Sequence, residues 1–374
     1  MSTYLDYNAT APVRPDAVKA VLKALEIGGN PSSVHAAGRA ARALVEGARA
    51  DVAALVSASS AAVTFVSGGA EANSLAIESA VASGVTRLIL GATEHDTVVQ
   101  TAAASGLPVL VCPVDGRGVA DLDWLNAQLG LGGRALVCLM LANNETGVIQ
   151  PVAQAGALTR AAGSWLHVDA IQAAGKIQLS MVDLGADTLA LSGHKIGGPQ
   201  GTGALVAGPG ATITRRLHGG GQERGLRAGT ENAPGIAGFG AAARAALTDL
   251  PRMAAMSPWR DELQAQFVAA GAVALGAETP RLPQTLCIAT PGYPSELQVI
   301  ALDLVGVMVS AGAACSSGKV KASRVIAAMG REDLSPFSLR ISGGWASTRD
   351  DWHHCARAWS EIQTRRATRH LEHA

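Results

Sequence analysis

Short apolar runs recur along the first two-thirds of the chain and alternate with segments of helical character. The apolar runs are typical of buried strands and occupy residues 62–66, 87–90, 108–111, 135–141, 165–168 and 188–191. Helix-like segments lie between most of these runs, at residues 70–82, 96–103, 122–129 and 152–162. This alternation predicts an α/β fold with a mainly parallel sheet covered by helices on both faces. In such a sheet, functional groups gather at the C-terminal ends of the strands.

The two ends of the chain follow other patterns. Residues 16 to about 50 predict two helices separated by a turn at residues 29–32, the first with apolar residues at helical spacing: Val18, Val21, Leu22 and Leu25. Beyond residue 250 the pattern changes to a helix, a strand, a helix and a strand, at residues 259–270, 285–289, 296–304 and 308–310. We therefore expect a large domain at residues 16–250 and a smaller α+β domain made of residues 1–15 and 251–374.

Composition and charge narrow the classes of partner and location. The 374 residues include 30 basic and 30 acidic side chains and no basic run, which argues against a nucleic-acid surface. No apolar stretch reaches the roughly 18 residues that span a bilayer, and the N-terminus lacks the pattern of a secretory signal. The five cysteines include no C-x-x-C spacing. We therefore expect a cytoplasmic protein with reduced thiols, no metal site and no membrane or nucleic-acid partner.

A candidate cofactor site stands at two successive strand ends. The turn Ser192-Gly193-His194-Lys195 follows the apolar run at residues 188–191, and Asp169 ends the run before it. A lysine amine forms a Schiff base with the aldehyde of pyridoxal phosphate (PLP), and a carboxylate pairs with the protonated pyridine nitrogen. Ser192 and His194 can reach the cofactor phosphate from the same turn. The turn alone could be an ordinary exposed one, but its distance from Asp169 favours a PLP site.

Three other strand ends carry possible ligand contacts. The turn Ser67-Gly68-Gly69-Ala70-Glu71 opens a helix, where backbone N–H groups suit a phosphate, although such turns are common in α/β sheets. His95 could stack on a planar ring or be an ordinary core or surface residue. Asn144 could meet the polar edge of a ligand or belong to a tight turn.

Two basic features suit anionic ligands. The loop at residues 218–230 places Arg224, Arg227 and Thr230 among many glycines, which suits an anion site better than a mere linker. Arg340 alternates with apolar residues on a probable strand at residues 338–342. It could clamp a substrate carboxylate in bidentate fashion or form a structural ion pair.

One cysteine has the surroundings of a nucleophile. Cys315 lies among small residues at positions 310–318, which predicts an exposed loop and a reactive thiol. Cys112 and Cys138 lie inside apolar runs and Cys287 in a predicted strand, so these three are expected to be inert core thiols. Cys355 is expected to be an incidental helix residue.

Taken together, these motifs resemble the NifS-like cysteine desulfurases of the class V aminotransferase superfamily. Segments 4–10 and 29–33 add to the match, which runs in order from residue 4 to residue 342. The resemblance implies PLP fold type I, a homodimer, PLP as cofactor and L-cysteine as substrate. It also implies a reaction that leaves alanine and a persulfide on Cys315.

The resemblance also implies a role for each site residue. Lys195 would carry the Schiff base and shuttle the proton, Asp169 would pair with the pyridine nitrogen, and His95 would stack on the ring and act as an acid–base. Gln172 and Asn144 would contact the ring hydroxyl. The phosphate would be held by Gly69, Ala70, Ser192 and His194, with Thr230 from the partner subunit. Arg340, helped by Asn30, would bind the substrate carboxylate.

The segment of about 25 residues between Cys315 and Arg340 resembles the subgroup with an extended cysteine loop. There the loop passes sulfur to scaffold and acceptor proteins for iron–sulfur clusters or thiolation, and Cys315 could transiently bind a cluster on a scaffold. The chain departs from the family at Ala70 and Ala313, where threonine and serine are usual, and at Gly344-Trp345. Alternatives are a selenocysteine lyase, a class V aminotransferase or a weakly active PLP-binding scaffold.

Overall fold

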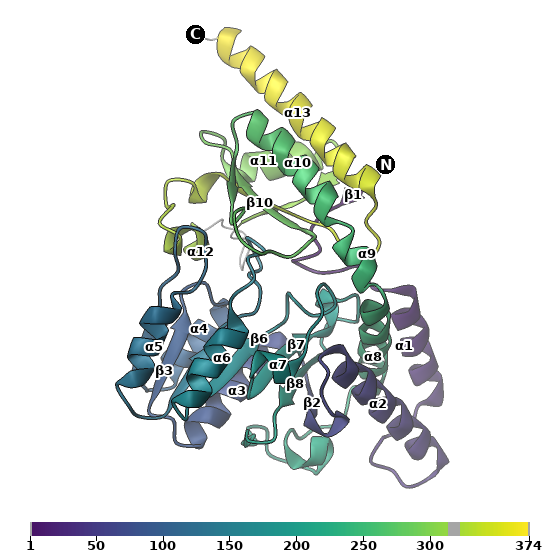
Figure 1. Ribbon diagram of the computed structural model, residues 1–374. Coiled ribbons are helices and arrows are strands. Elements are labelled where there is room, and N and C mark those ends of the chain that lie inside the picture. Colours follow the sequence, from purple (N-terminus) through teal and green to yellow (C-terminus); the bar gives the residue numbers. More distant parts are fainter. Residues whose placement is uncertain (1, 313–321, 373–374) are drawn as a thin grey trace.

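The structure, a computed structural model, describes residues 2–312 and 322–372 (Figure 1). Its largest sheet has seven strands in the order β2-β8-β7-β6-β5-β3-β4. They are β2 (Val63–Val66), β3 (Arg87–Gly91), β4 (Val109–Cys112), β5 (Ala135–Cys138), β6 (Trp165–Asp169), β7 (Thr188–Ser192) and β8 (Gly203–Ala207). Strands β3 to β7 pair in parallel, whereas β8 is antiparallel to both β2 and β7. The sheet is therefore mixed and mostly parallel, as expected.

Several elements were not predicted from the hydrophobic pattern, among them a strand and a helix of the large layer, and one predicted strand is shorter than expected. Strand β8 is a short apolar run that begins with Gly203 in a glycine-rich stretch. Helix α8 (Ala233–Thr248) is so rich in buried alanine and glycine that it shows no clear polar face at helical spacing. Strand β5 ends at Cys138 instead of residue 141, because the N–H of Met140 donates to the Glu94 carboxyl and not to a neighbouring strand.

Helices cover both faces of this sheet, as its strands require, since most of them are buried along their whole length. On one face, α3 (Gly69–Ala82) and α4 (Asp96–Ala104) pack against Leu88 and Leu90 of β3. On the other face, Ile89 joins a core that includes α2 (Ala36–Leu55), α5 (Leu122–Gly130), α6 (Val152–Ala161) and α8. Neighbouring side chains of one strand thus pack into cores on opposite faces of the sheet, and this fixes the register of the strands.

Helix α1 (Pro15–Ile27) forms as predicted, but its apolar stripe faces outward in the single chain. Val18, Leu22 and Leu25 are 44%, 54% and 59% exposed, whereas the buried side chains of the helix are Ala17 and Ala24. The small residues of α1 face α8, because the two helices pack closely and α8 is rich in glycine (Figure 1). The apolar stripe is left without a partner in this chain.

The C-terminal part forms a smaller α+β layer above the edge of the large sheet (Figure 1). Its antiparallel sheet has the order β12-β13-β10-β9, with β9 (Val273–Leu275), β10 (Thr285–Ala289), β12 (Ser310–Ala311) and β13 (Ser338–Ser342). Its helices are α9 (Leu250–Ala254), α10 (Ser257–Ala269), α11 (Ser295–Asp303), α12 (Arg324–Ala328) and α13 (Arg349–Glu372). The expected strand at 308–310 is split into β11 (Val307–Met308) and β12.

The N-terminal strand lies in this upper part of the molecule. Strand β1 (Thr3–Tyr4) pairs in parallel with β11, and Asp6 forms an isolated bridge with Ser342. The chain thus begins in the smaller layer, passes the junction and enters the large one; the domain limits at residues 15 and 250 stay a prediction. Within the described ranges, no helix combines the length and the apolar sequence needed to cross a membrane.

Candidate active site

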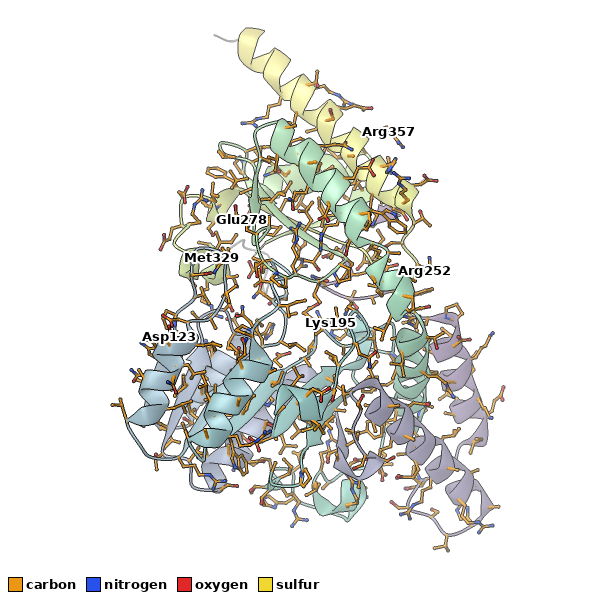
Figure 2. All side chains as sticks on the ribbon, viewed as in Figure 1. Asp123, Lys195, Arg252, Glu278, Met329 and Arg357 are labelled. Carbon is orange, nitrogen blue, oxygen red and sulfur yellow. The ribbon has the colours of Figure 1, made fainter. Side chains whose placement is uncertain are left out.

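A cavity of about 540 Å³ opens at the C-terminal ends of the parallel strands. Ten of the residues expected to form the site line it: Gly69, Ala70, His95, Asn144, Asp169, Gln172, Ser192, His194, Lys195 and Arg340. Figure 2 shows Lys195 at the junction between the large sheet and the smaller layer. The fold therefore brings together residues that are spread over more than two-thirds of the sequence.

Lys195 ends the short turn (Gly193–Lys195) that follows β7. Its Nζ atom donates hydrogen bonds to the backbone oxygens of Asn8 and Ala9, at 2.6 and 2.8 Å. The segment before α1 thus reaches across the junction to hold the lysine amine. This contact could not be read from the motif around Lys195.

Asp169 ends β6 and is held at both carboxylate oxygens. Its Oδ2 accepts from Asn73 Nδ2 at 2.9 Å and its Oδ1 from the N–H of Ile171 at 3.0 Å. Asn73 Oδ1 is in turn 3.0 Å from Nε2 of the buried His167. Burial lowers the pKa of His167 to about 4, so this ring is neutral near pH 7 and donates to Asn73. The chain of contacts fixes the orientation of the Asp169 carboxylate.

His95 caps the N-terminus of α4 with its own side chain. Nδ1 accepts from the N–H of Thr97 at 3.2 Å, and the Thr97 hydroxyl lies 3.0 Å away. The ring is therefore anchored through Nδ1. Burial, reinforced by the nearby Asp169 charge, raises the pKa of the preceding Glu94 to about 8, which keeps that carboxyl neutral at pH 7.

The glycine-rich turn and the lysine turn meet at one end of the cavity. Helix α3 begins at Gly69, where an added Cβ would lie 2.2 Å from Ile171 Cδ1, so a larger residue there would have to displace the end of the Ile171 side chain. His194 Nδ1 is 3.1 Å from the Thr10 hydroxyl. Burial and the charges of Lys195 and Lys176 lower the pKa of His194 to about 4, so it is a neutral ligand near pH 7.

Two side-chain oxygens at the cavity are buried and lack a hydrogen-bond donor among the described residues: Gln172 Oε1 and Asn8 Oδ1. Gln172 Nε2 donates to the backbone oxygen of Asn8 at 3.0 Å, which holds the Gln172 amide in place. Unmet acceptors are costly in a buried site. Their presence indicates that a ligand supplies a donor here.

Arg340 lies on β13 and is 3% exposed. Its Nη2 donates to Asp6 Oδ1 at 2.8 Å and its Nη1 to the backbone oxygen of Asn144 at 3.2 Å. Nε is buried and has no acceptor within the described part of the chain. Arg340 therefore forms an ion pair and also lines the cavity, and its binding of a substrate carboxylate stays a prediction.

Comparison with known proteins decides the family. The class V aminotransferase model matches residues 3–353. The chain belongs to this family. It is 42% identical over 336 residues to a cysteine desulfurase of Cereibacter sphaeroides, covering 87% of this chain and 86% of the relative. The class V assignment and the resemblance to cysteine desulfurases are both confirmed.

Comparison with solved structures supports the same family. A NifS-like protein from Rickettsia africae has a TM-score of 0.88 at 31% identity, covering 97% of this chain and all of that one. A structure titled "SspA in complex with cysteine" has a TM-score of 0.77 at 25% identity, covering 91% of this chain and 98% of that one. The fold is thus the fold type I of NifS-like PLP enzymes, as expected.

Enzymes of this class V family generally depend on PLP, and the residues of this chain fit such a cofactor. An amine and an oriented carboxylate stand at adjacent strand ends, at Lys195 and Asp169. A helix N-terminus at Gly69 suits the phosphate, and the unmet oxygens of Gln172 and Asn8 suit a hydroxyl donor.

Two described residues that were expected at the class V site do not line this cavity, and a third falls outside the described residues. Asn30 is exposed in its turn, where its Oδ1 accepts from the N–H of Ser32, and it does not line the cavity of this chain. Thr230 lines a separate cavity of about 80 Å³ that shares Ser67, Gly201 and Thr202 with the main one. Cys315 lies outside the described residues, as does Ala313.

The four other cysteines are buried and free. Burial raises the pKa of Cys112 to about 11 and those of Cys287 and Cys355 to about 12, and raises that of Cys138 well above its ordinary value. Cys355 is not incidental, as the sequence suggested, because it is fully buried in the core between α13 and the smaller sheet. A thiol with so high a pKa is a poor nucleophile.

The sequence analysis did not identify three residues that line the cavity or hold a site residue in place. Asn8 and Thr97 line the cavity, and Asn73 holds Asp169 from the first turns of α3. Asn73 could have been suspected because it lies one helical turn from the glycine-rich turn. No local sequence pattern identifies Asn8. Its contact with Lys195 exists because the N-terminal segment crosses from the smaller layer to the large sheet.

Proposed function

We propose that this protein is a PLP-dependent cysteine desulfurase that converts L-cysteine to alanine and carries the released sulfur as a persulfide on Cys315. The observation that carries the proposal is the meeting of Lys195, Asp169 and Arg340 in one cavity. An amine, an oriented carboxylate and a buried guanidinium are the groups that a PLP enzyme acting on an amino acid requires.

Each residue then has a defined task. PLP, when bound, supplies an electron sink for the carbon next to the substrate carboxylate. Lys195 removes and returns a proton at that carbon, while Asp169 keeps the pyridine nitrogen protonated. Arg340 binds the substrate carboxylate through its guanidinium, and His95 exchanges a proton with the substrate sulfur through Nε2, since Nδ1 is held by Thr97.

Sulfur transfer balances without an outside redox partner. The Cβ–S bond of cysteine breaks, the sulfur bonds to Cys315 Sγ, and the carbon takes up a proton. One cysteine and one thiol thus give one alanine and one persulfide. Because the four described cysteines are buried, Cys315 is the thiol left for this step.

The assembly and partners are part of the proposal. The exposed apolar stripe Val18, Leu22 and Leu25 suits a homodimer contact. We propose that Thr230 then reaches the cavity of the partner subunit, and that a sulfur-acceptor protein takes the persulfide in the cytoplasm. Sedimentation analysis of wild type and a Leu22→Asp, Leu25→Asp double variant tests the dimer.

Substitution of Cys315 by serine tests the function. We expect the PLP-loaded variant to keep its spectral response to cysteine, which depends on Lys195 and Arg340, and to lose alanine production. Mass spectrometry of the wild type after cysteine treatment should place the mass of one sulfur atom on the Cys315 peptide. Full alanine production by the variant, or sulfur on another cysteine, would overturn the desulfurase and favour an aminotransferase, which needs no thiol there.

A further inference from the structure

The side chain of Asn73 connects α3, on which it lies, with β6 and with α4. Asn73 is fully buried and does not itself line the cavity. Its two amide N–H groups donate to Asp169 Oδ2 at 2.9 Å and to Thr97 Oγ1 at 3.0 Å. Its Oδ1 lies 3.0 Å from Nε2 of His167. Both donors and the oxygen of this amide therefore have partners.

The contacts of His167 fix which way round this amide lies. Burial lowers the pKa of His167 to about 4, so the ring carries a single N–H near pH 7. The Asn73 oxygen can only accept, which places that N–H on Nε2 and leaves Nδ1 as an acceptor. Nδ1 is 2.9 Å from the hydroxyl of Thr188, which lies opposite His167 in the pairing of β6 with β7. A directed chain of donors thus runs from Thr188 through the ring and the amide to Asp169, and all its members are buried.

The second N–H of the same amide reaches His95 through Thr97. The Thr97 hydroxyl, which accepts from Asn73, lies 3.0 Å from His95 Nδ1. The backbone N–H of Thr97 donates to the same ring nitrogen at 3.2 Å. His95 and Thr97 both belong to the start of α4, whereas Asn73 reaches them from the neighbouring α3. The amide therefore supports Thr97, and Thr97 anchors the ring of His95.

Asp169 and His95 both line the cavity, and under the proposed function both contact the same cofactor ring. Two groups that meet one flat ring must keep a fixed position relative to each other. A buried network whose members all have partners is rigid, and the loss of one member leaves the others unpaired. Without the Asn73 amide, Asp169 Oδ2 would lose this donor and the His167 N–H would lose its acceptor.

We propose that Asn73 is a positioning residue shared by Asp169 and His95: its amide holds the carboxylate directly and the imidazole through Thr97, so that both meet one cofactor ring. The inference deepens the proposed function and rests on it for its purpose. The arrangement itself exists in the chain without cofactor, where it can be measured separately from catalysis.

The first measurement uses the full-length, cofactor-free protein with isotope-labelled nitrogen in its histidines. Two-bond proton–nitrogen correlation spectra show which ring nitrogen carries the proton, and the spectra of His167→Asn and His95→Gln assign the two signals. Asn73→Leu removes the amide at similar size, and Asn73→Ala is the second variant, which places no larger apolar group against the site. Asn126→Leu is the matched control, because Asn126 is exposed on α5. Urea unfolding verifies that each variant is folded.

The His167 signal reports the orientation of the amide. In the wild type we expect the proton on Nε2, where it can be donated to Asn73. In Asn73→Leu the proton should move to Nδ1, because the Thr188 hydroxyl is the partner that remains to the ring among the described residues. A wild-type proton on Nδ1 would overturn the inference, since the amide would then turn its oxygen towards Asp169.

The His95 signal reports the second arm of the amide. It should shift in Asn73→Leu and in Thr97→Val, and it should stay in place in Asn126→Leu. His35 is the internal control, because it caps α2 through Nδ1 in the same way, with a backbone N–H at 3.3 Å. A His95 signal that is unchanged in folded Asn73→Leu, or that shifts together with the His35 signal, would overturn the shared role.

The second measurement uses the PLP-loaded enzyme. Asn73→Leu should raise the Kd for PLP roughly tenfold to hundredfold, the change that loss of one hydrogen bond to a charged group produces. It should lower kcat and leave the KM for L-cysteine within about twofold, since Arg340 is untouched. Wild-type values of Kd and kcat in folded Asn73→Leu would overturn the inference. Failure of the wild type to take up PLP would refute the proposed function, but the histidine spectra would still decide what Asn73 holds.

Discussion

Replacing Ala70 by threonine is expected to tighten PLP binding. Ala70 is the second residue of α3, is exposed and lines the cavity next to the glycine-rich turn. A hydroxyl there adds one hydrogen bond to a charged phosphate, which contributes about 1.5–3 kcal/mol. The Kd for PLP should therefore fall between about tenfold and hundredfold.

The lower helix propensity of threonine does not offset this gain. It amounts to roughly 0.5 kcal/mol and acts on the unfolding equilibrium, because α3 is already formed before the cofactor binds. The variant should thus be slightly less stable without PLP and bind PLP more tightly. A lower stability of the PLP-free protein together with a higher affinity for PLP is the result expected from the added hydroxyl.

Equilibrium dialysis of PLP against cofactor-stripped protein gives the Kd, with Ala70→Val as the matched control. Valine has the shape of threonine without the hydroxyl, so it should bring no gain. Equal affinity of the alanine and threonine proteins would refute the reasoning and show that backbone N–H groups already satisfy the phosphate. A gain of the same size with valine would assign the effect to packing.

Three further outcomes are expected. Lys195→Ala should lose borohydride-reducible PLP and all turnover, and trapped cofactor in this variant would move the Schiff base to another lysine. Glu223→Gln should lower the free energy of unfolding in urea by about 1.5–3 kcal/mol, because the buried Arg49 guanidinium loses its buried carboxylate and keeps only the half-exposed Glu46, whereas Glu361→Gln at an exposed pair should change it by less than about 1 kcal/mol. Stability should fall as the pH drops from 6.5 towards 4, since His167 and His194 take up a proton in this range only when the protein is unfolded. His167→Asn should therefore reduce this slope, and an unchanged slope would contradict the contribution assigned to His167.

Much of the site could be predicted from the sequence because its residues follow strand ends. Asp169, Lys195 and His95 each stand directly after an apolar run, and parallel strands bring their C-terminal ends to one edge. At these positions the local sequence pattern and the strand order both place the side chain at the same edge of the sheet. The same logic failed for β8, because its short apolar run begins at Gly203, close to Gly201, and such glycines are more typical of a turn than of a strand.

Residues that act through tertiary contacts could not be predicted in this way. The place of Asn73 near the glycine-rich turn is visible in the sequence, but its contact with Asp169 is not. The hydrogen bond from the Lys176 amine to the Lys195 carbonyl has no local signal at all. The sequence also gave no sign that the apolar stripe of α1 would face outward. Periodicity identifies the stripe, but it does not say which face the neighbouring α8 covers.

The N-terminal segment joins the substrate end and the cofactor end of the cavity. Asp6 pairs with Arg340 of the smaller layer, and two and three residues later Asn8 and Ala9 hold the Lys195 amine on the large sheet. A shift of this segment must therefore alter the guanidinium and the amine together. Under the proposed function, a substrate carboxylate bound by Arg340 meets the same segment that holds Lys195, because Asp6 and Ala9 are only three residues apart.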